Sequence, residues 1–119
     1  IKDSIIFNLQ YGDVKEDIIN FTKKQNCQLI TLETLDLFNN FSGLANLLKN
    51  LDLFFTVSNS TAHLAGALGV KTILIKPANH VSFHYWDYED GKTPWYRSVN
   101  IISKENLKDK EFINKIFKL

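Results

Sequence analysis

The chain has 119 residues, a length that fits one domain with a single core. Its 14 Lys and Arg balance 13 Asp and Glu to a formal net charge of +1, which gives no sign of the clustered basic face that nucleic-acid binding needs. The single cysteine, Cys27, rules out a disulfide within the chain, so we expect an inert core thiol in a reducing, cytoplasmic setting.

The first half of the chain alternates β-favouring and helix-favouring patterns. Strands are predicted at residues 5–9 and 28–32, and helices at residues 14–24 and 43–50, with Ser42 as the cap of the second helix. No apolar stretch approaches the length of a membrane span, and no signal peptide is visible. Because the chain starts without a methionine, we expect a fragment or the C-terminal lobe of a longer protein.

The central stretch predicts one strand–helix–strand crossover. Residues 51–57 are almost continuously apolar, which suits a strand buried on both faces. Small polar residues follow at 58–61, and the helix behind them ends at Gly69, which can adopt the left-handed cap conformation. Residues 72–75 form the next predicted strand, which Pro77 stops.

The start of this central helix is the first candidate site. Ser58, Ser60 and Thr61 supply hydroxyls, Asn59 supplies a carboxamide and His63 supplies an imidazole. The unpaired amides and partial positive charge of a helix start attract anions. Two readings stay open: either Ser60 or Asn59 only caps the helix, or the turn binds a ligand. A cationic histidine is disfavoured at a helix start unless an anion lies there too, which favours the second reading.

A long aromatic loop over residues 79–98 is the second candidate site. It contains these aromatic side chains: His80, His84, Tyr85, Trp86, Tyr88, Trp95 and Tyr96. Such a loop either folds back over the sheet edge or forms a lid whose rings stack on a sugar or base. We expect Trp95 and Tyr96 to be mainly structural, and residues 80–86 to lie nearer a pocket. The acids of the loop match no metal-binding spacing, so no metal site is predicted.

After the loop, residues 99–102 predict a last strand, and Asn106 or Asp109 opens a C-terminal helix with Phe112 and Ile113 facing inward, together with Ile116 and Phe117. Strands that alternate with helices predict an α/β fold with a mostly parallel sheet, a Rossmann-like three-layer sandwich in one domain over residues 1–119.

These residues carry a resemblance to a known family. The segment VSNSTAHLAGALG, from Val57 to Gly69, resembles the nucleotide-sugar-binding motif of GT-B glycosyltransferases similar to ADP-heptose:lipopolysaccharide heptosyltransferases. Thr93 to Ser98 resembles the Ser-Pro-Trp-Tyr-Pro-Ser segment of versions attached to tetratricopeptide repeats in bacteria, and Trp86 has the expected spacing before it. The opening NLQYGD, from Asn8 to Asp13, is similar to the first strand and turn of that C-terminal domain. The resemblance spans nearly the whole chain and implies one half of a GT-B fold.

The resemblance implies a set of substrate-binding positions and leaves the catalytic residues unknown. His63 and the amides near Ser60 and Thr61 would face the diphosphate of a nucleotide-sugar, and Gln10 and Tyr11 would reach the phosphate or sugar. The full set comprises Gln10, Tyr11, Ser58, Asn59, Ser60, Thr61, His63, His80 and Trp86. The chain departs from the family pattern at three positions: Ser58 stands for Asp, Asn59 for Thr and Lys71 for Pro.

Three function classes follow. The first is the donor-binding lobe of a glycosyltransferase, inactive without a second lobe, with a nucleotide-sugar as substrate and no further cofactor. Its expected partners are the missing N-terminal lobe or a repeat domain, and self-association through an uncovered apolar face is possible. The second is a non-catalytic interaction domain whose polar groups engage one another. The third is a response-regulator-like or flavodoxin-like domain, which the missing acidic cluster and hydroxyl-rich turn after the first strand disfavour.

Overall fold

The computed structural model describes residues 4–25, 28–77, 85–86 and 91–117. Backbone contacts divide the chain into two compact units, Ile1–Asn46 and Leu47–Leu119, and each is described by itself. Strands alternate with helices, and every pairing between the named strands of the described residues is parallel. The predicted α/β, Rossmann-like class is therefore confirmed. The extent of a single domain over residues 1–119 stays a prediction.

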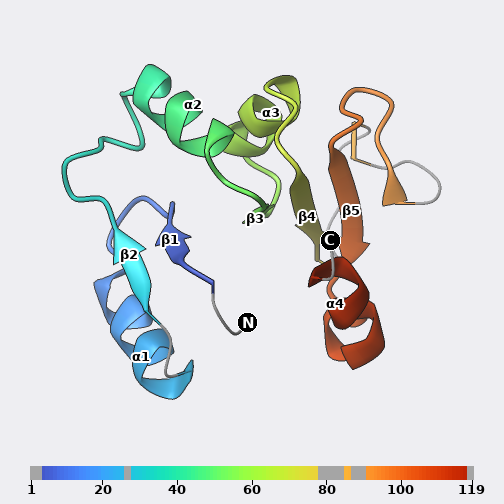
Figure 1. The fold of residues 1–119 in the computed structure, drawn as a ribbon, viewed down its shortest axis with the longest axis horizontal. Coiled ribbons are helices and arrows are strands. Elements are labelled where there is room, and N and C mark those ends of the chain that lie inside the picture. Colours follow the sequence, from blue (N-terminus) through green and yellow to red (C-terminus); the bar gives the residue numbers. More distant parts are fainter. Residues whose placement is uncertain (1–3, 26–27, 78–84, 87–90, 118–119) are drawn as a thin grey trace. The chain divides into compact units, whose positions relative to one another are not determined.

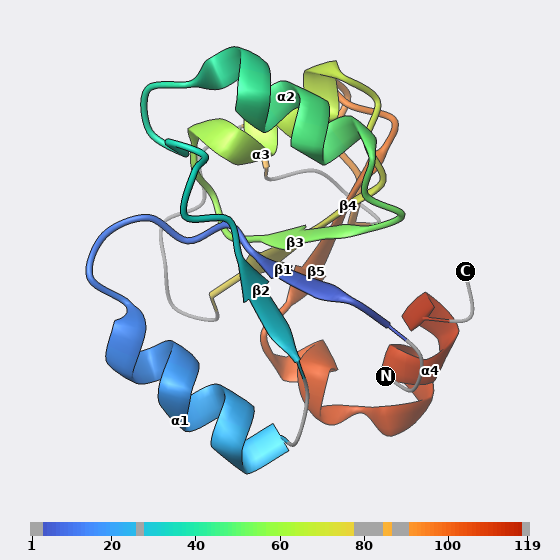
Figure 2. The ribbon, with the colours of Figure 1, turned by 60° about the vertical axis from the view of Figure 1, so that its left-hand side comes forward.

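The first unit contains a two-stranded parallel sheet with a helix between its strands. β1 (Ile6–Asn8) pairs with β2 (Leu29–Thr31), so that Phe7 lies opposite Ile30. The connecting helix, α1 (Lys15–Gln25), has acidic residues in its first turn and lysines in its last turn, which complements the helix dipole. Figure 2 shows α1 below the two strands.

The helix α2 (Phe41–Lys49) starts two residues earlier than predicted. The side-chain oxygen of Asn40 accepts from the Gly43 amide over 2.8 Å, and the Asn40 carbonyl accepts from the Leu44 amide over 2.9 Å. Asn40 is therefore the N-cap, and the prediction of Ser42 is wrong because an amide side chain two positions earlier already caps the helix. Leu44 and Leu48, four positions apart on one face of this helix, are buried.

The second unit contains a three-stranded parallel sheet. β3 (Phe54–Thr56), β4 (Thr72–Lys76) and β5 (Val99–Ser103) lie side by side in that order (Figure 1). β4 is central and its first three residues are buried. A buried cluster next to this sheet comprises Ala62, Leu74, Trp86 and Val99.

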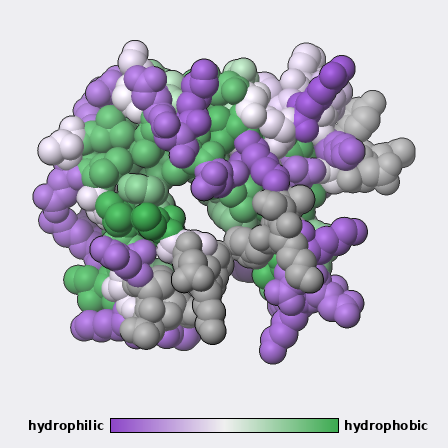
Figure 3. Space-filling model, in the orientation of Figure 1, coloured by the Kyte–Doolittle hydropathy of each residue, from purple (hydrophilic) through white to green (hydrophobic). Residues whose placement is uncertain are grey.

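β3 is less buried than its sequence predicts. Phe54 is buried, but Phe55 is 37% exposed and Val57, just after the strand, is 51% exposed. Within the three-stranded sheet of this unit, β3 pairs with β4 alone. The prediction of burial on both faces is therefore wrong for this strand. Figure 3 shows hydrophobic residues, in green, and hydrophilic residues, in purple, side by side on one face.

The crossover from β3 to β4 runs through α3 (Ser60–Ala67). Asn59 caps its start, and Gly69 follows its end with φ +71°. The Gly69 amide donates to the Gly66 carbonyl over 3.1 Å and the Val70 amide to the Ala65 carbonyl over 2.9 Å. This paired pattern is a Schellman motif, which confirms the predicted role of Gly69.

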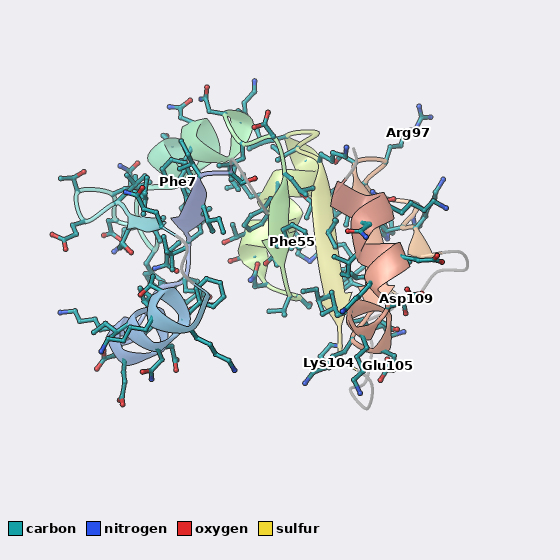
Figure 4. The ribbon with its side chains drawn as sticks, turned by 60° about the horizontal axis from the view of Figure 1, so that its bottom comes forward. Phe7, Phe55, Arg97, Lys104, Glu105 and Asp109 are labelled. Carbon is teal, nitrogen blue, oxygen red and sulfur yellow. The ribbon has the colours of Figure 1, made fainter. Side chains whose placement is uncertain are left out.

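The chain continues from β5 through a 3-10 turn (Glu105–Lys108) into α4 (Lys110–Phe117), beyond the carboxyl end of β5. Asp109, labelled in Figure 4, accepts from the Glu111 and Phe112 amides over 2.9 and 3.2 Å and so caps α4. The side chains of Ile116 and Phe117 lie outside the described part. Within the described residues, no helix has the length and apolarity needed to span a bilayer.

Candidate functional site

The candidate site lies at the carboxyl end of β3, where the chain turns into α3. This is the edge of a parallel sheet at which ligands bind in open α/β folds. Ser58 and Ser60 are exposed and Thr61 is half-buried. Among the described residues, no acceptor takes the backbone amides of Ser60 and Thr61. Within the described part of the chain these two N–H groups are left without an acceptor, which is the feature that anion-binding helix starts share.

Both the oxygen and the nitrogen of the Asn59 carboxamide make hydrogen bonds to neighbouring residues of the chain. Its oxygen accepts from the Ala62 amide over 2.9 Å, and its nitrogen donates to the Thr56 hydroxyl over 3.0 Å. That hydroxyl in turn donates to the Val57 carbonyl over 3.0 Å. Asn59 thus fixes the turn between β3 and α3, and the capping reading is confirmed for this residue.

His63 sits in an aromatic cluster contributed by α3 and by the segments around residues 85 and 96. Its ring stacks on Trp86 with centroids 4.6 Å apart and an interplanar angle of 30°. Tyr85 meets the imidazole edge-on at 4.9 Å. The Tyr96 hydroxyl lies 3.0 Å from His63 Nδ1, within hydrogen-bond distance. The imidazole is therefore held in one orientation by contacts on several sides.

Partial burial lowers the pKa of His63 below its ordinary value of 6.5, because desolvation disfavours the charged form. The ring is consequently neutral at pH 7, with one nitrogen as donor and the other as acceptor. Nδ1 is used by Tyr96, whereas Nε2 makes no hydrogen bond to a described residue. A neutral histidine also removes the conflict between a cation and the positive end of the helix dipole.

Trp86 belongs to the interior of this unit. Its side chain is 3% exposed and lies in one buried cluster with Ala62, Leu74 and Val99. The indole N–H donates to the Ser58 hydroxyl over 2.9 Å. Trp86 therefore fixes the position of the turn and supports the imidazole that stacks on it. Its predicted role as a substrate-binding residue stays a prediction.

The two aromatic residues of the Thr93–Ser98 segment, Trp95 and Tyr96, have different surroundings. Tyr96 lies against α3 so closely that a Cβ built on Gly66 would be 2.5 Å from the Tyr96 ring, which agrees with the structural role expected for it. Trp95 is 65% exposed, so the structural role expected for this residue is wrong. The Trp95 amide donates to the buried Thr93 hydroxyl over 3.2 Å, which turns the chain so that Tyr96 points inward. Arg97 is exposed and points outward in Figure 4.

The remaining predicted site residues belong to the first unit or lie outside the described residues. Gln10 and Tyr11 belong to the first unit, where the Gln10 amide donates to Asn8 Oδ1 over 3.1 Å. The Tyr11 ring is 52% exposed and meets Phe38 edge-on with centroids 5.9 Å apart. His80 lies outside the described residues. The structure brings together Ser58, His63 and Trp86, and the binding roles of all the predicted residues stay predictions.

The Tyr96–His63 contact is what the sequence did not predict. The two residues are 33 positions apart, and no spacing rule connects them. Gly66 offered one signal, because a glycine inside an otherwise Ala- and Leu-rich helix indicates close approach of another group. The ring of Tyr96 is that group.

Comparisons with known proteins give one distant relationship. The chain is 31% identical over 101 residues to Protein FlbA of Caulobacter vibrioides. The match covers 85% of this chain and 16% of FlbA, so the chain spans a small part of that relative. No protein-family model matches the chain, and no solved structure matches it.

Proposed function

We propose that the chain is the donor-binding lobe of a GT-B glycosyltransferase, which holds a nucleotide-diphosphate-sugar and is incomplete for catalysis on its own. One observation carries the proposal. His63, whose Nε2 makes no hydrogen bond to a described residue, and Ser60 and Thr61, whose amides no described acceptor takes, all belong to the first half of α3, which starts at the carboxyl end of β3. The resemblance of Val57 to Gly69 to the nucleotide-sugar motif supports the same ligand class.

The chemistry suits a diphosphate. The amides and the partial positive charge of the α3 start contribute fixed donors that need no reorganisation when negative charge develops. An imidazole N–H adds a further neutral donor near them. Donors of this kind stabilise a departing nucleotide diphosphate without adding a proton to it, which is what glycosyl transfer from a nucleotide-sugar requires.

Turnover needs a second lobe. In the GT-B arrangement the active site lies in the cleft between two Rossmann-like lobes, and the other lobe supplies the acceptor site and usually the base. We propose this N-terminal lobe, or a tetratricopeptide-repeat domain, as the partner of the chain.

The test is a ligand titration followed by backbone amide NMR. UDP, GDP and ADP, each alone and as its glucose derivative, are added to the isotope-labelled chain. We expect one nucleotide to give saturable shifts centred on Ser60, Thr61 and His63. His63→Phe keeps an aromatic ring on Trp86 but loses both ring nitrogens, so it should weaken binding. Tyr85→Phe keeps its ring contact with His63 and serves as the matched control.

The proposal fails if no nucleotide produces localised, saturable shifts at millimolar concentration. It also fails if His63→Phe binds the nucleotide as tightly as the unmodified chain and the control Tyr85→Phe do. Shifts spread evenly over exposed lysines would indicate non-specific anion binding, which contradicts a donor site.

A non-catalytic interaction domain is the second candidate, and one observation favours it. Ser58, Asn59 and His63 all engage other groups of the same unit through their side chains. A domain that had lost its donor would hold its polar groups in this way. The titration separates the two candidates, because a non-catalytic interaction domain would be folded but would bind no nucleotide.

A further inference from the structure

We propose that Tyr96 is a positioning residue that fixes the tautomer of His63. Its hydroxyl donates to Nδ1, so that the proton of the imidazole resides on Nε2 and Nε2–H is directed to a phosphoryl oxygen of the ligand. This inference deepens the proposed function and rests on it for the identity of the ligand. The tautomer itself can be measured with no ligand present.

The direction of the hydrogen bond follows from the chemistry of the two groups. Nδ1 and the Tyr96 hydroxyl are 3.0 Å apart, and the ring is neutral at pH 7, so one ring nitrogen must be unprotonated. A phenol hydroxyl is a better donor than a neutral imidazole N–H, and an unprotonated imidazole nitrogen is a better acceptor than a phenol oxygen. The stronger arrangement therefore has Tyr96 donating and Nδ1 accepting. An anion near Nε2 favours the same tautomer, because it needs a donor there.

Aromatic packing holds the His63 ring where Nδ1 can accept from Tyr96. The imidazole stacks on Trp86 at 4.6 Å and meets Tyr96 edge-on at 5.7 Å. The Tyr96 ring is itself packed against α3 at Gly66, where a Cβ would be 2.5 Å from it. A ring flip that exchanged the nitrogens would break the bond to Tyr96 while leaving the stack, so the hydroxyl is the feature that selects the orientation.

Two variants separate positioning from packing. Tyr96→Phe keeps the ring that lies on Gly66 and removes only the hydroxyl. Tyr85→Phe removes a hydroxyl from another ring that contacts His63, at 4.9 Å, and is the matched control. Loss of a purely structural contact would lower the stability of both variants without changing the tautomer.

The first measurement is a long-range proton–nitrogen NMR spectrum of the imidazoles at about pH 8, well above the ordinary histidine pKa. His63→Phe identifies the His63 signals by their disappearance. We expect the unmodified chain and Tyr85→Phe to show the Nε2–H tautomer, and Tyr96→Phe to show a substantial Nδ1–H population. The inference is overturned if the unmodified chain holds the Nδ1–H form, or if Tyr96→Phe leaves the His63 signals unchanged.

The second measurement repeats the nucleotide titration with Tyr96→Phe, using the same UDP, GDP and ADP probes. We expect roughly 2- to 10-fold weaker binding, the fold-change that one net hydrogen bond corresponds to. Equal affinity of Tyr96→Phe and the unmodified chain would overturn the ligand-directing role. If the tautomer responds as expected but no nucleotide binds, the proposed function fails while the control of His63 by Tyr96 stands.

Discussion

The indole N–H of Trp86 donates to the hydroxyl of Ser58 over 2.9 Å, although the two residues are 28 positions apart. Trp86 is buried, and Ser58 lies in the turn between β3 and α3. The bond therefore ties the aromatic segment to the turn that presents the α3 amides. The acceptor for the indole is the neutral oxygen of a serine.

Removing that acceptor should destabilise the chain. Ser58→Ala removes the acceptor of a partly buried indole hydrogen bond, so we expect a loss of about 1 kcal/mol in the free energy of unfolding. The measurement is urea unfolding followed by tryptophan fluorescence. Ser60→Ala is the control, since this exposed hydroxyl makes no hydrogen bond to a described residue, and it should change stability by less than about 0.5 kcal/mol. Equal losses in the two variants would show that the hydrogen bond from the Trp86 indole to Ser58 does not contribute to stability.

The close contact between Gly66 and Tyr96 predicts an unusual response to alanine. In a helix interior Gly→Ala ordinarily stabilises by about 1 kcal/mol. At Gly66 the added Cβ would be 2.5 Å from the Tyr96 ring, so we expect Gly66→Ala to cost roughly 1–3 kcal/mol instead.

A double-mutant cycle tests the cause of this cost. Tyr96→Ala removes the clashing ring, so in that background Gly66→Ala should become neutral or stabilising. Thermal or urea unfolding of the four proteins measures the coupling between the two positions. A Gly66→Ala penalty of the same size in both backgrounds would contradict the contact with Tyr96.

Features coded by neighbouring residues could be predicted from the sequence. Gly69 ends α3 in the left-handed conformation, and Asp109 caps α4, because each acts on amides or carbonyls within a few positions. The parallel β3–α3–β4 crossover could be predicted for the same reason, from an apolar run, a polar turn and a short Ala-rich stretch. The predicted cap of α2 is wrong because Asn40 and Ser42 are both residue types that cap helices, and only the geometry shows that Asn40 does so.

Features that depend on distant residues could not be predicted. The burial of Trp86 and the bond from Tyr96 to His63 arise from tertiary packing, which no local pattern encodes. Likewise the exposure of Phe55 depends on which strand pairs with β3, and an apolar run is the same whether its strand is central or at an edge. Trp95 and Tyr96 are adjacent aromatic residues that differ in burial, since Trp95 is exposed and Tyr96 is partly buried.

Two glycines with similar backbone angles should respond differently to alanine. Gly69 and Gly91 have φ of +71° and +67°, a region that disfavours residues with a Cβ. A Cβ at Gly69 would meet nothing within 4 Å, whereas one at Gly91 would be 2.6 Å from the Ile101 carbonyl oxygen. We expect Gly69→Ala to cost about 1 kcal/mol and Gly91→Ala to cost roughly 1–3 kcal/mol more, because backbone must shift. Urea unfolding of both variants measures the difference, and similar losses would contradict the close approach at Gly91.

The pKa of His63 predicts how stability depends on pH. Burial lowers this pKa below 6.5 in the folded chain, so between the two values the unfolded chain binds more protons than the folded one. The free energy of unfolding should therefore fall as the pH drops through 6.5, and this loss should level off below the folded pKa. His63→Phe removes the titrating group, so the difference between the two proteins isolates its effect from that of His80 and His84.

The measurement is urea unfolding of the unmodified chain and His63→Phe from about pH 8 to about pH 5. Asp36 does not interfere in this range. Hydrogen bonds from the Asn39 side chain, the Asn39 amide and the Phe38 amide lower its pKa below 3.8, so the stability it contributes is lost only in more acidic solution. The unmodified chain should lose stability relative to His63→Phe as the pH falls. A constant difference, or one that changes in the opposite direction, would mean that the folded chain tolerates the imidazolium. The aromatic cluster would then not hold His63 as the neutral donor that the proposed site requires.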